Sequence, residues 1–194
     1  SQRLLPAGPW REPLSGIRRA SIAIITRKTA SDSQRDAVAA AIREAAPDTP
    51  QAVVRLLPSL LVSTADATTL PASHLDGKRV LAVAAIGYPA AFFEQLESLG
   101  AEVVRRSFPD HHAFIRADID EMNLADGRSE LVVCTLKDAV KLTAMWPADA
   151  PPLWYVSQSL EVESGEPAVD QLLKLLNRTL SDTWPSIASL RQVR

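Results

Sequence analysis

The sequence predicts an α/β fold, with helices flanking a largely parallel sheet in three layers. Short apolar runs alternate with amphipathic segments through short loops, a pattern typical of βαβ units. Apolar residues make up 46% of the 194 residues and charged residues 23%, so the chain can bury a sizeable core. The single cysteine, Cys134, excludes an internal disulfide framework and suits a reducing compartment.

The first part of the chain begins with an irregular segment and continues into alternating elements. Residues 1–16 contain three prolines and two glycines without a hydrophobic period, which predicts an ordered or docking loop. A β-branched apolar run predicts a strand over 21–26. Caps at 31–33 then precede a helix over 34–46, in which Val38, Ile42 and Ala45 share one face. Residues 51–64 follow as one or two strands, interrupted at Pro58.

The second part continues the alternation to the end of the domain. The predicted elements are a strand over 79–86, a helix over 89–99 stopped by Gly100, a strand over 101–108, a helix over 116–124, a strand over 131–135, a short helix from 137, a strand over 153–156 and a helix over 168–180. We therefore predict a leader or interdomain segment over 1–20, an α/β domain over 21–183 and a tail over 184–194.

Charge, hydropathy and one absent motif exclude several functions. A net charge of −2 gives no basic field for nucleic acid. No run of about 18 apolar residues predicts a membrane span, and the first residues do not resemble a secretion signal. The sequence has no G-x-x-x-x-G-K-[ST] motif, because its one Gly-Lys pair, Gly77-Lys78, is followed by Arg79 and a predicted strand. We therefore expect no P-loop nucleotide site within these residues.

Polar residues gather where predicted strands end. The four segments are Thr26-Arg27-Lys28, Ile86-Gly87-Tyr88-Pro89, Phe108-Pro109-Asp110-His111-His112 and Thr135-Leu136-Lys137-Asp138. In an open parallel sheet, ligands bind beyond the carboxyl ends of the strands. The sequence therefore predicts that its polar chemistry is concentrated at one edge of the sheet.

The segment Asp110-His111-His112 allows three interpretations. A metal site needs further ligands, and adjacent histidines do not easily bind one ion, while His74 is the only other imidazole. Asp110 or a neighbour could instead cap the following turn. A histidine at the edge of a cleft could also orient a partner or accept a proton. Spacing alone does not decide among these.

The other candidate residues have structural alternatives as well. Lys137 could attract an anion, while Thr135 or Asp138 could cap the helix that follows. Gly87 could allow a tight turn or the close approach of a ligand. Arg11 could bind phosphate or carboxylate, or form a solvated pair with Glu12.

Four segments in order resemble the tetraacyldisaccharide 4'-kinases of lipid A biosynthesis. They are RLLPAGPWREPL (3–14), AIGYPAAFFEQLESLGAEVV (85–104), FPDHHAF (108–114) and TLKDAVKL (135–142), and the resemblance extends over residues 3–180. It implies ATP-dependent phosphorylation of the 4'-hydroxyl of a lipid A disaccharide precursor, at the cytoplasmic face of the inner membrane of Gram-negative bacteria. It also implies an N-terminal P-loop domain, a smaller C-terminal α/β domain and an active site between them.

The resemblance assigns roles to individual residues. His111, after Asp110, would pair with the catalytic aspartate of the other domain. Arg11 would hold the anionic disaccharide, with Glu12 orienting it. Lys137 and Asp138 match a Thr-x-Lys-Asp segment, although Leu136 stands where the family usually has glutamate. Trp10 likewise stands where the family commonly has leucine.

The resemblance also predicts what this chain needs from elsewhere. The P-loop, the catalytic aspartate and the Asp-Asp-Gly-x-Gln-His segment of the family do not occur here. ATP and Mg²⁺ would therefore be bound mainly by an N-terminal P-loop domain, and this chain would supply the C-terminal part of the site and be inactive alone. Peripheral membrane association is left open. The alternative is a non-catalytic binding or regulatory module derived from the same scaffold.

Overall fold

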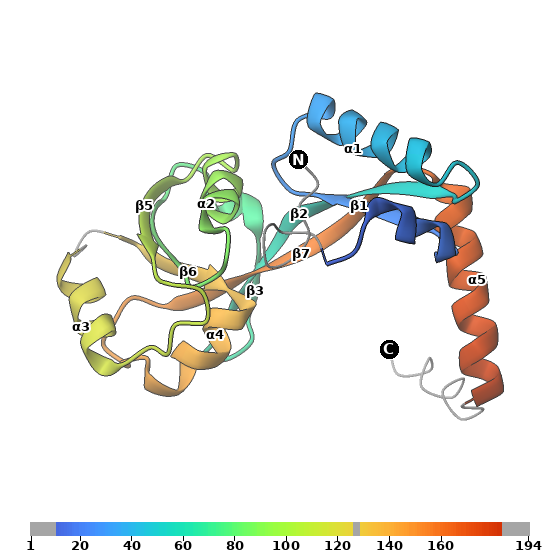
Figure 1. The fold of residues 1–194 in the computed structure, drawn as a ribbon. Helices are drawn as coiled ribbons and strands as arrows, with labels where there is room; N and C mark the ends of the chain where they lie inside the picture. Colours follow the sequence, from blue (N-terminus) through green and yellow to red (C-terminus); the bar gives the residue numbers. More distant parts are fainter. Residues whose placement is uncertain (1–10, 126–128, 184–194) are drawn as a thin grey trace. The chain divides into compact units, whose positions relative to one another are not determined.

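The computed structural model describes residues 11–125 and 129–183 (Figure 1). It divides into two compact units, of which one comprises residues 1–55 and 161–194 and the other residues 56–160. We call these unit 1 and unit 2 and describe each by itself. Two long strands, β2 (Gln51–Ser63) and β7 (Leu153–Ser164), contribute to both units. The predicted domain boundaries at residues 20 and 183 stay predictions, and the predicted tail over 184–194 lies outside the described residues.

Unit 1 is built on a parallel strand pair. Its elements are η1 (Leu14–Arg19), β1 (Ala23–Arg27), α1 (Asp32–Ala45), the first part of β2, the last part of β7 and α5 (Glu166–Thr183). β1 pairs with β2 in parallel, from Ala23 opposite Gln51 to Arg27 opposite Arg55. Residues of α1, β1 and β2 form a small core, against which Leu14 and Ile17 of η1 pack.

Helix α1 begins where the capping residues predict. The Ser31 side chain accepts a hydrogen bond from the Gln34 N–H, and the Gln34 side chain accepts one from the Ser31 N–H, which satisfies two N–H groups of the first turn. The predicted inward face is wrong at Val38, whose exposed fraction is 46%. Ile42 is buried as predicted, and Ala39 rather than Val38 joins it in the core of this unit.

A largely buried ion pair joins β1 to β7 within unit 1. Arg27 donates from Nε to Glu163 Oε2 at 2.7 Å and from Nη2 to Glu163 Oε1 at 2.6 Å. This bidentate geometry is the strong form of such pairs. The hydrogen bonds from Arg27 lower the pKa of the Glu163 carboxyl. Arg27 therefore holds two strands together at the carboxyl end of β1.

Unit 2 contains most of the sheet. In chain order it comprises the later part of β2, β3 (Thr69–Pro71), η2 (Ala72–Leu75), β4 (Arg79–Ala84), α2 (Pro89–Glu97), β5 (Glu102–Ser107), α3 (Arg116–Ala125), β6 (Leu131–Thr135), α4 (Leu136–Leu142), η3 (Thr143–Met145) and the first part of β7. β4 lies between β5 and β6 and is parallel to both, and β6 is parallel to β7. β3 pairs with β2 in the antiparallel sense.

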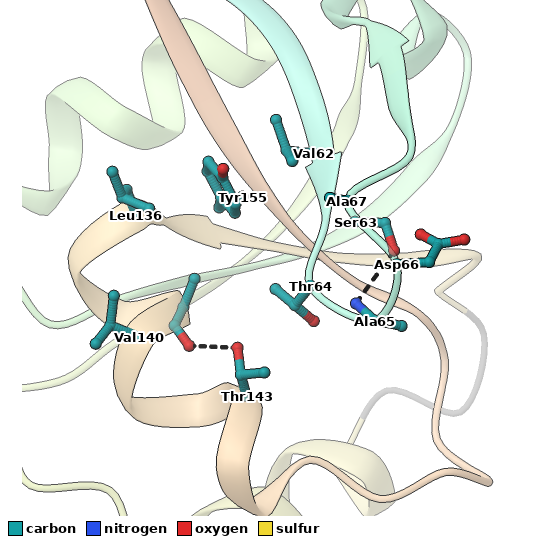
Figure 2. A pocket seen from close by; sticks show the side chains of 11 residues that line it. Val62, Ser63, Thr64, Ala65, Asp66, Ala67, Leu136, Val140, Thr143 and Tyr155 are labelled. Atoms are coloured by element: carbon teal, nitrogen blue, oxygen red, sulfur yellow. Dashed lines mark hydrogen bonds between the residues drawn. The ribbon is translucent and has the colours of Figure 1, made fainter.

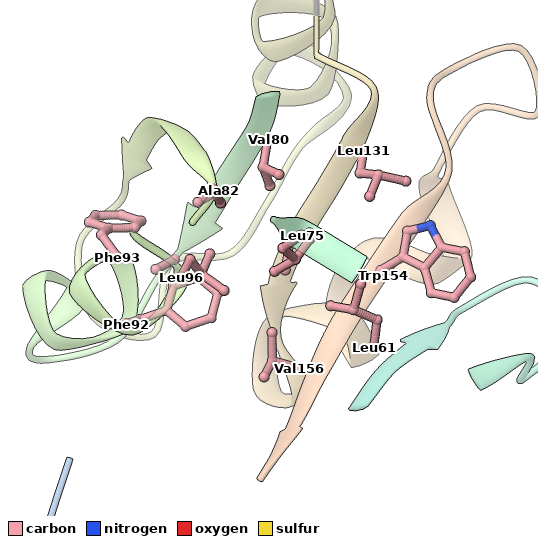
Figure 3. Close-up of a cluster of buried hydrophobic side chains, with 13 residues drawn as sticks. Leu61, Leu75, Val80, Ala82, Phe92, Phe93, Leu96, Leu131, Trp154 and Val156 are labelled. Atoms are coloured by element: carbon pink, nitrogen blue, oxygen red, sulfur yellow. The ribbon is translucent and has the colours of Figure 1, made fainter. Parts of the chain in front are cut away.

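Alternating side chains place a core on each face of this sheet. Val80 and Ala82 of β4 pack with α2 on one face, where Phe92 and Leu96 are buried (Figure 3). Leu81 and Val83 pack with α3 and α4 on the other face. Burying one leucine or phenylalanine side chain stabilises the fold by about 1.5–3 kcal/mol. The predicted α/β class is confirmed, as a mostly parallel mixed sheet flanked by helices.

Two strands differ from the prediction. The predicted break at Pro58 is wrong, since β2 continues through it. β2 pairs with β1 only as far as Arg55 and with β3 only from Leu60, so neither β1 nor β3 requires an N–H from Pro58. β7 extends to Ser164 rather than ending near Val156. None of the helices in the described residues is long and apolar enough to cross a membrane.

Candidate functional site

The parallel strands of unit 2 end at one edge and bring three predicted segments together. Ala84 at the end of β4 is opposite Ser107 of β5, and Val83 is opposite Cys134 of β6. The segments that follow these strands cover 85–88, 108–114 and 135–138, and we call them the carboxyl edge of unit 2. The fourth predicted segment, Thr26-Arg27-Lys28, belongs to unit 1.

The loop after β5 is tied to the turn after β4 by its backbone. The Phe108 N–H donates to the Ala84 carbonyl at 2.9 Å, and the His111 N–H donates to the Ala85 carbonyl at 3.3 Å. His111 has a φ of +61°, in the left-handed region that residues other than glycine rarely adopt. Its backbone is thus held in an uncommon conformation by contact with the neighbouring turn.

The His111 side chain faces outward. Its exposed fraction is 83%, and its Nε2 lies 3.7 Å from the Asp110 Oδ2. A Cβ at Gly87 would lie 3.4 Å from the same carboxylate oxygen, so a side chain there would touch Asp110. The edge therefore brings together three of the predicted site residues, Gly87, Asp110 and His111, while Pro89 occupies the first turn of α2 as predicted.

His112, the next residue, is anchored from several directions. Its ring stacks on Phe108, with centroids 4.8 Å apart, and meets Phe114 edge-on at 5.2 Å. Its Nε2 lies 2.9 Å from the Asp118 Oδ2. The Lys141 ammonium donates to the His112 carbonyl at 3.0 Å. This histidine fixes the loop and presents little of its ring to solvent.

Asp118 links the loop to helix α3. Its Oδ2 accepts a hydrogen bond from the Ile115 N–H at 2.9 Å, in addition to its contact with His112. The Ile115 hydrogen bond, followed by that of His112, lowers the pKa of the Asp118 carboxyl. The side chain bonded to the N–H before α3 is therefore that of Asp118, a residue that the sequence analysis did not propose as a cap.

At the end of β6, Thr135 and Asp138 hold each other. The Thr135 Oγ1 accepts from the Asp138 N–H at 3.3 Å and so caps α4, while its hydroxyl donates to the Asp138 Oδ2 at 2.7 Å. The same Oδ2 accepts from the Ala85 N–H at 3.1 Å. Asp138 is completely buried, whereas Lys137 is exposed. Burial, and then the charge of Asp138, raise the pKa of the neighbouring Cys134 thiol, as expected of an inert core cysteine.

Arg11 and Glu12 lie in unit 1 and are exposed. Glu12 Oε2 accepts from Arg19 Nη2 at 2.5 Å, and among the described residues no ion pair joins Glu12 to Arg11. The structure therefore shows Glu12 oriented by η1. Residues 3–10 of the same predicted segment lie outside the described part of the chain.

A pocket of about 350 Å³ also lies in unit 2, between α4 and the turn from β2 to β3. Figure 2 shows Leu136 and Val140 on its helical side and Thr64 and Asp66 on the turn. None of the predicted site residues lines it. Within residues 11–125 and 129–183, no group of three or more His, Cys, Asp or Glu side chains is arranged to hold a metal ion.

Sequence reasoning did not find the role of His112, Asp118 or Lys141. One signal was available for the first, because an imidazole between Phe108 and Phe114 is typical of ring packing. Asp118 and Lys141 become neighbours of the loop only through the packing of α3 and α4.

Comparison with known proteins gives consistent results. The family model described as tetraacyldisaccharide-1-P 4'-kinase matches residues 1–177. The proteins named tetraacyldisaccharide 4'-kinase from Azoarcus sp. (strain BH72) and Anaeromyxobacter sp. (strain Fw109-5) are each 38% identical, over 89% and 92% of this chain and 45% and 47% of their own length. The crystal structure of LpxK from Aquifex aeolicus in complex with ATP is similar, with a TM-score of 0.56 and 26% identity over 91% of this chain and 48% of that one. The chain thus spans about half the length of these relatives.

Proposed function

Because this chain belongs to the tetraacyldisaccharide 4'-kinase family, we propose that it forms the C-terminal part of an ATP-dependent lipid A 4'-kinase. The acceptor would be the 4'-hydroxyl of a tetraacyldisaccharide 1-phosphate. The observation that carries the proposal is the exposed His111 imidazole on a tightly held backbone at the carboxyl edge of unit 2. This edge is where α/β sheets bind their ligands.

In this proposal, nucleotide is bound by the part of the relatives' sequence that this chain does not match. The sequence has no P-loop motif, and the described residues offer no cluster of metal ligands. The similar Aquifex aeolicus structure contains ATP. We therefore assign ATP and Mg²⁺ mainly to a P-loop domain that this chain does not include. The proposed reaction takes place at the cytoplasmic face of the inner membrane, where the protein would reach its lipid substrate by peripheral association.

His111 would orient the carboxylate that accepts the proton of the sugar hydroxyl. Phosphoryl transfer depends mainly on positioning and on charge stabilisation, and a well-placed acid or base contributes about 10²- to 10⁴-fold in rate. An imidazole suits this task because it can donate a hydrogen bond to a carboxylate while its charge state responds to the partner. The Asp110 carboxylate, whose Oδ2 lies 3.7 Å from Nε2, would help to orient the ring.

The remaining candidates would bind the substrate. Arg11 would contact an anionic group of the disaccharide, since a guanidinium matches phosphate with two parallel hydrogen bonds. Glu12, which forms an ion pair with Arg19, would help to orient the disaccharide. Lys137 is exposed beside the buried Asp138, where its ammonium could attract phosphate.

The decisive experiment is His111→Ala in the complete protein that contains this chain. We expect kcat for phosphate transfer from ATP to the disaccharide to fall about 10²- to 10⁴-fold. The melting temperature should not change, because the side chain is exposed. His74→Ala, at another exposed imidazole, is the matched control and should leave both quantities unchanged.

Two results would overturn the proposal. If His111→Ala kept full turnover, the histidine would have no part in catalysis. If the complete wild-type protein bound the disaccharide but transferred no phosphate, the non-catalytic binding module would be the better description.

A further inference from the structure

We propose that Asp138 is a positioning residue for His111, acting through the turn that follows β4. The inference rests on the proposed role of His111. Asp138 is the one charged residue among the buried polar residues of the described structure, and it is completely inaccessible to solvent. A buried carboxylate is costly unless it is hydrogen-bonded, so its partners indicate what it does.

Capping of α4 does not account for this carboxylate. Thr135 already accepts the Asp138 N–H and caps the helix. The Asp138 Oδ1 has no hydrogen-bond partner within the described residues, and Oδ2 accepts from the Thr135 hydroxyl and from the Ala85 N–H. Ala85 lies 53 positions away in the sequence. The hydrogen bond from the Ala85 N–H is therefore the contact of Asp138 that capping of α4 does not explain.

The Ala84–Ala85 peptide transmits this contact to the histidine loop. Its N–H donates to Asp138 at 3.1 Å, and its carbonyl accepts from the Phe108 N–H at 2.9 Å. The next carbonyl, that of Ala85, accepts from the His111 N–H at 3.3 Å. Hydrogen bonds linked in this way polarise and strengthen one another. A single buried carboxylate thus fixes the backbone that supports both the start of the loop and His111.

His111 depends on such support. Its φ of +61° is an unfavourable conformation, which persists only where the surroundings enforce it. Its ring is exposed and lies 3.7 Å from Asp110, so the backbone largely determines where the imidazole lies. A displacement of about 1 Å can lower a rate by about 100-fold. Loosening Ala85 would therefore reduce catalysis without removing any group that touches substrate.

The test compares Asp138→Ala with Asp138→Asn in the complete protein. Alanine removes the acceptor of the Ala85 N–H, and we expect kcat to fall about tenfold to 100-fold, with KM for ATP unchanged. The asparagine oxygen can still accept from Ala85 and Thr135, so most of the rate should return. Thr135→Val is the matched control, because it removes the cap of α4 and the hydroxyl that donates to Asp138 Oδ2, but keeps the carboxylate as the acceptor of the Ala85 N–H. It should lower the melting temperature and largely keep kcat.

A second measurement does not depend on activity. Amide hydrogen exchange at Ala85 and His111, followed by NMR, should accelerate in Asp138→Ala and return towards the wild-type rate in Asp138→Asn. If the alanine variant does not fold, Asp138→Ser replaces it, because the shorter hydroxyl does not reach the Ala85 N–H. If the exchange pattern appears but the complete wild-type enzyme transfers no phosphate, the positioning of His111 is supported and the proposed kinase function fails.

Two outcomes would overturn the inference. One is an asparagine variant as slow as the alanine variant while both amides stay protected, since the charge itself would then be required. The other is a loss of kcat in Thr135→Val equal to that in Asp138→Ala while the Ala85 and His111 amides of Thr135→Val stay protected, because the effect would then come from the end of α4.

Discussion

The loop over 108–114 has two sides made from adjacent residues, and they differ in almost every physical respect. On the outer side, Asp110 and His111 are exposed, and the His111 ring has an exposed fraction of 83%. On the inner side, the His112 ring has an exposed fraction of 27% and contacts two aromatic rings and Asp118. Neighbouring histidines thus separate two tasks, because the inner ring stabilises the loop while the outer ring is available to a partner.

The largest effect that can test this difference is expected at Phe114, on the inner side. This ring is buried, contacts Phe108 edge-on at 5.1 Å and lies under the Lys141 ammonium. Phe114→Ala should lower the free energy of unfolding by about 3–5 kcal/mol, measured by denaturant titration. Tyr88→Ala, at an exposed aromatic ring of the same edge, should change it by less than about 0.5 kcal/mol. Equal losses would show that the inner side is not the source of stability.

A smaller effect is expected at the histidines themselves. His112→Ala removes the ring stacking and leaves Asp118 without its side-chain partner, so the free energy of unfolding should fall by about 1–2 kcal/mol. His111→Ala should change it by less than about 0.5 kcal/mol. Denaturant titration of both variants measures the difference directly. If the two variants were equally stable, the separation of tasks would be wrong.

Much of the fold could be predicted because β4 and β6 are short apolar runs, and these strands and β5 are separated by clear helix signals. The parallel arrangement followed from that alternation, and with it the meeting of 85–88, 108–112 and 135–138 at one edge. The extension of β7 could not be predicted in this way, because Ser157 to Ser164 are mostly polar. Their strand conformation comes from pairing with distant residues rather than from local pattern.

The site was predictable only in part. Strand ends indicated where Asp110 and His111 would lie, but the left-handed φ that turns His111 outward depends on its bond to Ala85. Sequence alone also left the role of Asp138 open, since a helix cap and a distant backbone acceptor require the same residue type. Such assignments depend on contacts between residues far apart in the chain.

The smallest expected effect concerns the pH dependence of the inner side. Hydrogen bonds from Ile115 and His112 lower the pKa of the Asp118 carboxyl in the folded state. The ionised carboxylate therefore stabilises the fold above the unfolded pKa of about 3.9, and this stabilisation is lost as the pH falls through the lower folded pKa. Asp118→Asn should flatten that acid dependence. The measurement is the free energy of unfolding at a series of pH values from about 6 downwards.

Near neutral pH the variant should lack the stabilisation that the charge supplies, although the asparagine oxygen can still accept the Ile115 N–H. Asp149→Asn, at an exposed carboxyl, is the control and should keep the wild-type slope. An unchanged slope in Asp118→Asn would mean that Asp118 does not link the inner side to α3 through its charge. The contribution of His112 to the free energy of unfolding would then have to come from ring packing alone. Comparing His112→Ala with His112→Phe tests this, because phenylalanine would restore the lost stability completely only if packing were the whole cause.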